Sequence, residues 1–436
     1  MSDSRLLRNV RLLGSSVPVN ILLGHGFILA IEPCEEAVLC SKSTFDIQGR
    51  GMCVVPAMID IHTHSRVPGP NEAETAETFF QSAIVGGVAA IGLMPNTGPA
   101  ISTHENLELA DGLMGQSRVQ RKFWFGATPD NAKEIASVAK DPRVAGVKMY
   151  MGSSTGGLLV SQEHGQHSVM RTCAELGLRL VVHAEDEDMM ISIRNSLGRK
   201  PSVADHCKIR RTEVEVSAVK QALRLVEQTG CTVHFAHIST PESLELIFDA
   251  KCAGLPVTCE VCVHHLIFDE SKTNGGAGGF WKMNPPLRTM SQMYRLKEYL
   301  GCDGFVDVIA TDHAPHTRMA KVADDYDSVP SGVTGLQHMF PLLMTLTQHH
   351  SYMRRKLIDL TVKNPAHLLG MKDRGEVAPG NVADLVLFDD SQEASNTIWD
   401  RDTVSKCGWS PYHGMDVVGM PKIVILGGEV VYEAPH

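Results

Sequence analysis

The chain has 436 residues, of which 43% are hydrophobic and 21% charged, and this length suggests one large domain with a smaller companion. The formal net charge of -10 argues against a protein that binds nucleic acid or a membrane surface. Eleven cysteines scattered through apolar runs fit reduced thiols better than a disulfide framework. Residues 1–20 lack a secretory signal, and no apolar run reaches the length of a membrane span, so we expect a cytoplasmic protein.

Residues 1–51 are rich in Val, Ile and Gly at the spacing typical of β-hairpins, which predicts the first part of a small β-domain. From residue 52 to residue 373, short apolar runs alternate with amphipathic segments such as 71–87, 210–230 and 240–254. Apolar strands separated by helices are typical of a parallel sheet that is covered on both faces. Eight such units predict a (β/α)8 barrel. The runs are 53–62, 88–94, 122–127, 144–151, 178–185, 231–238, 256–263 and 305–312.

Residues 374–436 return to a hairpin-like pattern. Because a closed barrel can leave its termini close in space, we expect this segment to join residues 1–51 in one small β-sandwich-like domain. An open doubly wound sheet is the alternative, but no G-x-G-x-x-G motif follows a predicted strand.

Histidines and an aspartate recur at the predicted strand ends. His62 and His64 stand two residues apart in "IDIHTHSR", so on a strand they point to the same side and can share a metal ion. His183, His237 and Asp312 close the fifth, sixth and eighth runs. The carboxyl ends of barrel strands converge on the face that holds barrel active sites, so these residues predict a metal centre there.

Two further residues of these runs leave open questions. Lys148 lies inside the apolar run 144–151, where a side chain that extends its ammonium to the strand end would be the simplest explanation. An ammonium would repel a metal, whereas a neutral amine that takes up CO2 becomes a carbamate, an anion able to bridge two ions. His234 stands three residues before His237, so we expect it to face the helices as a packing histidine.

The ordered motifs "DIHTHSR", "MPNT", "GVKMYMG", "VVHAE", "FAHIS", "NPPLR" and "ATDHAPH" resemble those of the dihydroorotases of the amidohydrolase superfamily. The stretch "GEVAPGNVADLVLFD" resembles the superfamily's C-terminal β-segment, so the resemblance covers nearly the whole chain. It implies two zinc ions bridged by carbamylated Lys148 and a hydroxide. The other ligands it implies are His62, His64 and Asp312 for one ion, and His183 and His237 for the other.

The resemblance also implies the activity, which is reversible hydrolysis of the cyclic amide of dihydroorotate to N-carbamoyl-L-aspartate in de novo pyrimidine biosynthesis. Asp312 would transfer the proton. Arg66, Asn96 and His316 would hold the substrate carboxylate, and Asn284 would contact the pyrimidine ring. The resemblance also implies a homodimer, and it leaves open whether activity requires a transcarbamoylase partner.

Two alternatives stay open. A hydantoinase, dihydropyrimidinase or allantoinase acts on substrates without a carboxylate at that ring position, and an inactive scaffold homologue would usually have lost metal ligands. The chain departs from the dihydroorotase pattern at three positions: Ser65 stands where a larger apolar residue is common, and Val67 and Gln337 stand where Glu is common.

Overall fold

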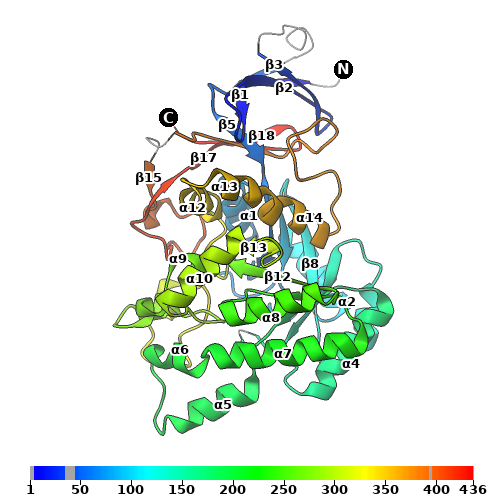
Figure 1. The fold of residues 1–436 in the computed structure, drawn as a ribbon, viewed down its shortest axis with the longest axis vertical. Helices are drawn as coiled ribbons and strands as arrows, with labels where there is room; N and C mark the ends of the chain where they lie inside the picture. Colours follow the sequence, from blue (N-terminus) through cyan, green and yellow to red (C-terminus); the bar gives the residue numbers. More distant parts are fainter. Residues whose placement is uncertain (1–3, 35–44, 155, 392–394, 436) are drawn as a thin grey trace.

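The computed structural model describes residues 4–34, 45–154, 156–391 and 395–435 (Figure 1). A barrel of strands and helices forms the larger part, and a smaller sheet built from both ends of the chain lies at one end of it. Among the residues described, no helix combines the length and the apolar character needed to cross a membrane.

Eight parallel strands follow one another around the barrel in chain order. The ring closes where Thr63 forms a parallel bridge with His313 and the His64 amide donates to the His313 carbonyl at 2.8 Å. Each strand overlaps one of the eight apolar runs, so the predicted barrel is confirmed. The strands are β6 (Met58–Thr63), β7 (Val88–Leu93), β8 (Gln120–Gly126), β9 (Val144–Tyr150), β10 (Leu180–His183), β11 (Val233–Phe235), β12 (Val257–Cys262) and β13 (Val308–Ala310).

The barrel strands are apolar on both faces because the barrel buries both faces. Ile59, Val181 and Trp124 belong to an inner core, where the Trp124 indole donates to the Ile61 carbonyl at 2.8 Å. A larger apolar cluster lies between the strands and the surrounding helices. These helices are α1 (Ala76–Val85), α2 (His104–Met114), α3 (Ala132–Val138), α4 (Glu163–Leu176), α5 (Glu187–Ser196), α6 (His206–Ile209), α7 (Thr212–Thr229), α8 (Pro241–Cys252), α9 (Val263–Ile267), α10 (Met290–Gly301), α11 (Arg318–Lys321), α12 (Met339–Leu346), α13 (Ser351–Ile358) and α14 (Asn364–Leu368).

Helix α7 shows how the sequence determines one of these elements. Its buried residues include Val214, Ala218, Ala222 and Leu225, which recur every three or four positions and so form one apolar stripe. The helix ends at Gly230, whose φ of 67° is a left-handed conformation that glycine adopts easily. The helix therefore matches the amphipathic segment that the sequence analysis identified.

The ends of the chain pair in one sheet, as predicted. Val54 lies opposite Leu387, and apolar side chains such as Ile21 and Ile425 from the two segments share one core. Figure 1 shows these blue and red strands side by side. The strands are β1 (Arg5–Leu12), β2 (Pro18–Gly24), β3 (Phe27–Pro33), β4 (Phe45–Gln48), β5 (Cys53–Pro56), β14 (Leu385–Phe388), β17 (Pro421–Leu426) and β18 (Glu429–Glu433), in the order β18-β17-β14-β5-β1-β2-β3 with β4 beside β1.

The first predicted barrel run, residues 53–62, is divided between the two sheets. Strand β5 pairs with β1 and β14 in the small sheet, and β6 begins the barrel after Ala57. Both strands are fully buried, so the apolar pattern alone could not separate them. The domain boundaries after residues 51 and 373 stay predictions.

A short antiparallel pair, β15 (Ser395–Thr397) and β16 (Asp416–Val418), flanks a segment that reaches the barrel. Within this 398–415 segment, the Trp409 indole donates to the His316 carbonyl at 2.7 Å. The C-terminal part of the chain therefore touches the loops at the carboxyl ends of the barrel strands.

Candidate active site

The side chains predicted to bind metal meet at the carboxyl ends of the barrel strands. They come from β6, β9 and β10 and from residues that lie one or two positions past the ends of β6, β11 and β13. All are buried, and the most exposed of them is His64 at 8%. The structure thus brings together the complete predicted set, which is His62, His64, Lys148, His183, His237 and Asp312.

The ligand atoms form two adjoining groups. In one, Asp312 Oδ1 lies 2.9 Å from His64 Nε2 and 3.4 Å from His62 Nε2, an arrangement that could hold a metal ion. In the other, His183 Nδ1 lies 3.0 Å from His237 Nε2. The ring centroids of His62 and His237 are 5.0 Å apart, so the two groups lie next to each other.

Two of these residues have unusual backbone conformations. The φ angle is +48° at Asp312 and +37° at His237, in the left-handed region that residues other than glycine seldom adopt. Such conformations persist where surrounding contacts hold them, and they cluster at functional sites. Both residues follow strand ends, where the chain turns at the mouth of the barrel.

Buried carboxylates orient two of the imidazoles. The Glu260 carboxylate contacts His62 Nδ1, and Glu185 Oε2 lies 2.8 Å from His183 Nε2. A metal-binding histidine usually makes such a hydrogen bond with its outer nitrogen, which turns the other nitrogen toward the metal. The sequence analysis did not select either glutamate, although each interrupts or closes an apolar run ("TCEVC", "VVHAE"), and that was the available signal.

The prediction for His234 is wrong in its direction. His234 Nε2 lies 3.2 Å from Glu260 Oε2, on the carboxylate that also contacts His62, so the ring faces the barrel interior. Strand β11 ends at Phe235 and His237 has a positive φ, so the alternation of sides does not continue to His237. His234 is nevertheless fully buried and hydrogen-bonded, as expected of a packing histidine.

Burial favours the neutral form of the imidazoles. It lowers the pKa of His64 to about 4 and also lowers the pKa of His183 and His237. The neutral imidazole is the form that binds a metal ion. These rings are therefore available as ligands at neutral pH.

Lys148 is completely buried, which excludes an ammonium that reaches solvent. Its Nζ lies 5.0 Å from the Tyr150 ring centroid and has no hydrogen-bond partner among the described residues. Burial lowers its pKa from 10.5 to about 8. A buried amine without a partner is costly unless another group meets it. Together with neutral imidazoles and a carboxylate, this amine fits a site that binds a metal.

Arg66 lies at the same cavity as the candidate ligands. Its Nε donates to the Pro315 carbonyl at 3.1 Å, and its Nη2 lies 2.9 Å from His316 Nε2. Burial lowers the pKa of Arg66 to about 10, and within the described part of the chain no carboxylate forms an ion pair with it. A desolvated guanidinium without an anion is well suited to bind a carboxylate.

Two asparagines line the cavity beside Arg66. Asn96 Oδ1 lies 2.6 Å from His64 Nδ1, so this residue also orients a candidate ligand. Asn284 Nδ2 donates to the Ser154 hydroxyl at 3.4 Å, while its buried Oδ1 has no partner among the described residues. The structure thus places Arg66, Asn96 and Asn284 around one cavity, and His316 reaches it through its contact with Arg66.

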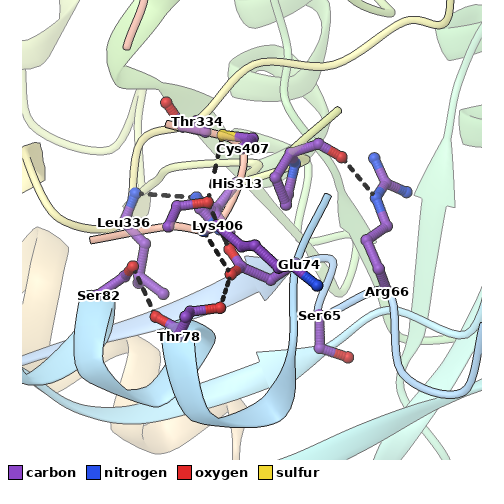
Figure 2. A network of polar contacts seen from close by, with 12 residues as sticks. Ser65, Arg66, Glu74, Thr78, Ser82, His313, Thr334, Leu336, Lys406 and Cys407 are labelled. Atoms are coloured by element: carbon purple, nitrogen blue, oxygen red, sulfur yellow. Dashed lines mark hydrogen bonds and ion pairs between the residues drawn. The ribbon is translucent and has the colours of Figure 1, made fainter. Parts of the chain in front are cut away.

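Glu74, which precedes α1, lies at the centre of a buried polar network (Figure 2). It accepts hydrogen bonds from the Thr78 hydroxyl, the Ser405 hydroxyl at 2.6 Å and the Lys406 amide at 3.2 Å, and it lies 3.2 Å from His313 Nε2. Burial alone would raise the pKa of Glu74, but these hydrogen bonds hold it below its usual range. The network joins the barrel to the 398–415 segment, and sequence reasoning did not find it.

The departures from the dihydroorotase pattern have local explanations at two positions. The Ser65 hydroxyl accepts from the Val67 amide at 3.3 Å and so supports the turn beside Arg66. Gln337 donates from Nε2 to the Asp402 carbonyl at 2.8 Å and accepts from the Val404 amide at 2.8 Å. A carboxylate could not donate the first of these bonds, so the amide fits the 398–415 segment better than Glu would.

Comparisons with known proteins agree with this geometry. The model of the amidohydrolase family matches residues 53–431. The chain is 33% identical over 433 residues to a dihydroorotase of Brevibacillus brevis, covering 96% of each, and 35% identical over 382 residues to one of Halobacterium salinarum, covering 87% and 86%. It is also similar to the solved L-hydantoinase (dihydropyrimidinase) of Arthrobacter aurescens, with a TM-score of 0.90, 26% identity, and coverage of 100% of this chain and 97% of the other. A dihydropyrimidinase of Brevibacillus agri, at 22% identity and a TM-score of 0.88, covers 99% and 95% and shares the fold.

Proposed function

The chain belongs to the amidohydrolase family, and from this premise we propose that it is a dihydroorotase, which interconverts dihydroorotate and N-carbamoyl-L-aspartate. The observation that carries this proposal is Arg66, a desolvated guanidinium without an anionic partner among the described residues, at the cavity of the candidate metal ligands. Dihydroorotate has a ring carboxylate to pair with it. Hydantoin, dihydrouracil and allantoin have none at that position.

The proposed metal centre consists of two zinc ions. His62, His64 and Asp312 would hold one, His183 and His237 the other, with Lys148 between them. Lys148 would be carbamylated, since a neutral amine attacks CO2, forms an N–C bond and releases one proton. The low pKa of this buried amine supports the step. Bound ions would lower the pKa of a water molecule toward 7 and polarise the amide carbonyl.

Asp312 is proposed to move the proton. Burial alone would raise the pKa of Asp312, but the neighbouring His62 and the hydrogen bond with His64 hold it well below its usual range. The carboxylate is therefore ready to accept a proton from the attacking water and to pass it to the leaving ring nitrogen. In the reverse direction Asp312 must begin protonated, so ring closure is favoured at lower pH.

Substrate orientation is assigned to the polar groups of the cavity. Arg66, with His316 and Asn96, would hold the carboxylate, because a guanidinium offers two parallel N–H groups. Asn284 would use its unpaired Oδ1 to accept from a ring N–H. These contacts would hold the substrate amide in one position and orientation, which lowers the entropic cost of reaching the transition state.

A comparison of substrates tests the proposal. Purified protein is assayed with dihydroorotate, dihydrouracil, hydantoin and allantoin, and its metal content is measured in the same samples. We expect two zinc ions per chain and a kcat/KM for dihydroorotate at least about 100-fold above the others, since a missing ion pair costs several kcal/mol. Faster turnover of an uncharged ring would favour a hydantoinase-type enzyme. Absence of metal and of ring opening would favour an inactive scaffold.

Two further measurements on the same protein test its proposed partners. Its mass in solution tests the proposed homodimer, and turnover by the isolated chain tests the need for a transcarbamoylase partner.

A further inference from the structure

Tyr150 closes strand β9 two residues beyond Lys148. Side chains two apart on a strand point to the same side and are separated by about 6.6 Å along it, so Tyr150 forms the layer above Lys148. The Lys148 Nζ lies 5.0 Å from the Tyr150 ring centroid, and the His183 ring centroid lies 5.8 Å from it. The tyrosine therefore stands directly beside two of the candidate metal-binding side chains.

The Tyr150 hydroxyl is an unpaired polar group in a buried place. The residue is 5% exposed, and its hydroxyl has no hydrogen-bond partner among the described residues. Tyr150 also lines the cavity formed with Arg66, Asn284 and Asp312. A buried hydroxyl without a partner is costly, and buried tyrosines usually find one. A ligand in the cavity would supply it.

The neighbours of Tyr150 indicate which part of the ligand its hydroxyl would contact. In the proposed function, the substrate carboxylate pairs with Arg66 from the loop after β6, and a ring N–H of the substrate donates to the Asn284 oxygen. The amide to be attacked must lie against the metal-binding side chains, and that is where Tyr150 stands beside Lys148 and His183. A tyrosine hydroxyl ordinarily carries its proton near neutral pH, so it can act as a hydrogen-bond donor.

We propose that the Tyr150 hydroxyl donates a hydrogen bond to the oxygen of the reacting amide. The inference rests on the proposed function and adds a catalytic residue to it. As water adds to the carbonyl carbon, the C–O π electrons move to this oxygen, which becomes an anion until the C–N bond breaks. A fixed donor stabilises that charge more than it stabilises the neutral carbonyl, so it acts mainly on kcat.

The test compares two tyrosine variants. Tyr150→Phe removes only the hydroxyl and keeps the ring. Tyr412→Phe is the matched control, because Tyr412 is likewise buried and its hydroxyl has no partner among the described residues, but it does not line this cavity. Loss of an unpaired buried hydroxyl should leave the melting temperature unchanged or higher in both variants. We expect kcat of Tyr150→Phe to fall about 100-fold with little change in KM or zinc content, as is typical of losing one oxyanion donor. Tyr412→Phe should keep wild-type kinetics.

Several outcomes would overturn the inference. A kcat for Tyr150→Phe within about twofold of the wild type would exclude a donor to the developing anion. A rise in KM at unchanged kcat would assign the hydroxyl to ground-state binding instead. If the wild type prefers another cyclic amide, only the proposed substrate is wrong, and the variants are compared on that amide. If the wild type opens none, the proposed function and this inference fail together.

Discussion

Glu74 Oε2 lies 3.2 Å from His313 Nε2, and this contact fixes the residue that follows Asp312. His313 Nδ1 accepts from the Gly335 amide at 3.2 Å, so the ring carries its proton on Nε2 and donates it to Glu74. From the other side, Asp60 accepts from the amide and the hydroxyl of Thr311. Two buried carboxylates therefore hold the short turn in which Asp312 has a positive φ.

Removal of the Glu74 carboxylate should loosen this turn. We expect Glu74→Ala to lower the free energy of unfolding by about 3 kcal/mol, because it leaves several buried donors unpaired. Zinc affinity should fall as well, since Asp312 loses its support. Glu74→Gln, which keeps an acceptor oxygen, should lose less unfolding free energy and less zinc affinity than Glu74→Ala. The measurements are denaturant unfolding and zinc titration, with Glu175→Ala on the exposed face of α4 as the control. Equal zinc affinity in all three variants would exclude the positioning role.

Lys148 is expected to be essential for the metal centre. Lys148→Ala removes the only residue of the candidate set that could supply a bridging anion by carbamylation. We expect fewer than two zinc ions per chain and a loss of activity of at least about 1,000-fold, in line with loss of a metal-assisted reaction. Added acetate or propionate should restore part of the activity, because a small carboxylate can occupy the vacated space. A variant that keeps two zinc ions and full turnover would show that Lys148 does not bridge.

Arg66 should control substrate choice. Arg66→Met is expected to lower kcat/KM for dihydroorotate by about 1,000-fold and to change that for dihydrouracil only a little, since the lost interaction involves the carboxylate alone. The kcat/KM of Arg66→Lys for dihydroorotate should lie between those of the wild type and Arg66→Met, because an ammonium lacks the planar fork of the guanidinium. Equal losses on both substrates would mean that Arg66 supports the cavity through Pro315 and His316 rather than binding the carboxylate.

The pattern of apolar runs was sufficient to predict the barrel, because most residues of the barrel strands are buried and helices such as α7 have an apolar stripe. The convergence of His62, His183 and Asp312 followed from one rule about strand ends. The same rule could not predict Glu260, because its role depends on a contact with His62 of β6, a strand that is separated from β12 by β13. The contact of Glu74 with Ser405 joins residues far apart in the chain, and no local pattern marks such a pair. Likewise, the split at Ala57 depends on which sheet offers a partner, and not on the sequence of the strand.

The direction of the reaction should depend on pH through Asp312. Its neighbours hold its pKa low, so the ionised form that ring opening needs is present across the neutral range. Ring closure needs the protonated form, so its rate should fall as pH rises from about 6 to 9, while ring opening should not fall in parallel. Initial rates in both directions, followed by absorbance at a constant ionic strength, would measure this. A closing rate that climbs steadily over that range would contradict the role of Asp312.

Lys282 offers a test of electrostatics away from the candidate ligands. Its side chain is buried, its Nζ donates to the Tyr326 carbonyl at 2.7 Å and the Val329 carbonyl at 2.6 Å, and burial lowers its pKa from 10.5 to about 8. Between these two values the unfolded chain binds a proton that the folded chain does not, so stability should rise with pH there. Relative to Lys282→Met, the wild type should gain up to roughly 3 kcal/mol of unfolding free energy from pH 8 to 10.5, and nothing below pH 8.

Denaturant unfolding of both proteins at several pH values measures the gain at Lys282 as a difference, so that the titration of other groups cancels. Lys208→Met, at a lysine whose side chain is 72% exposed, is the control and should show a constant difference. The two carbonyls bound by Lys282 belong to the segment that leads to Gly332, and Gly332 lines the candidate cavity. Lys282→Met should therefore make this side of the cavity less ordered and raise the KM for the substrate. A wild-type advantage that shrinks as pH rises from 8 would mean that the amine is held in its charged form, the opposite of what its burial predicts.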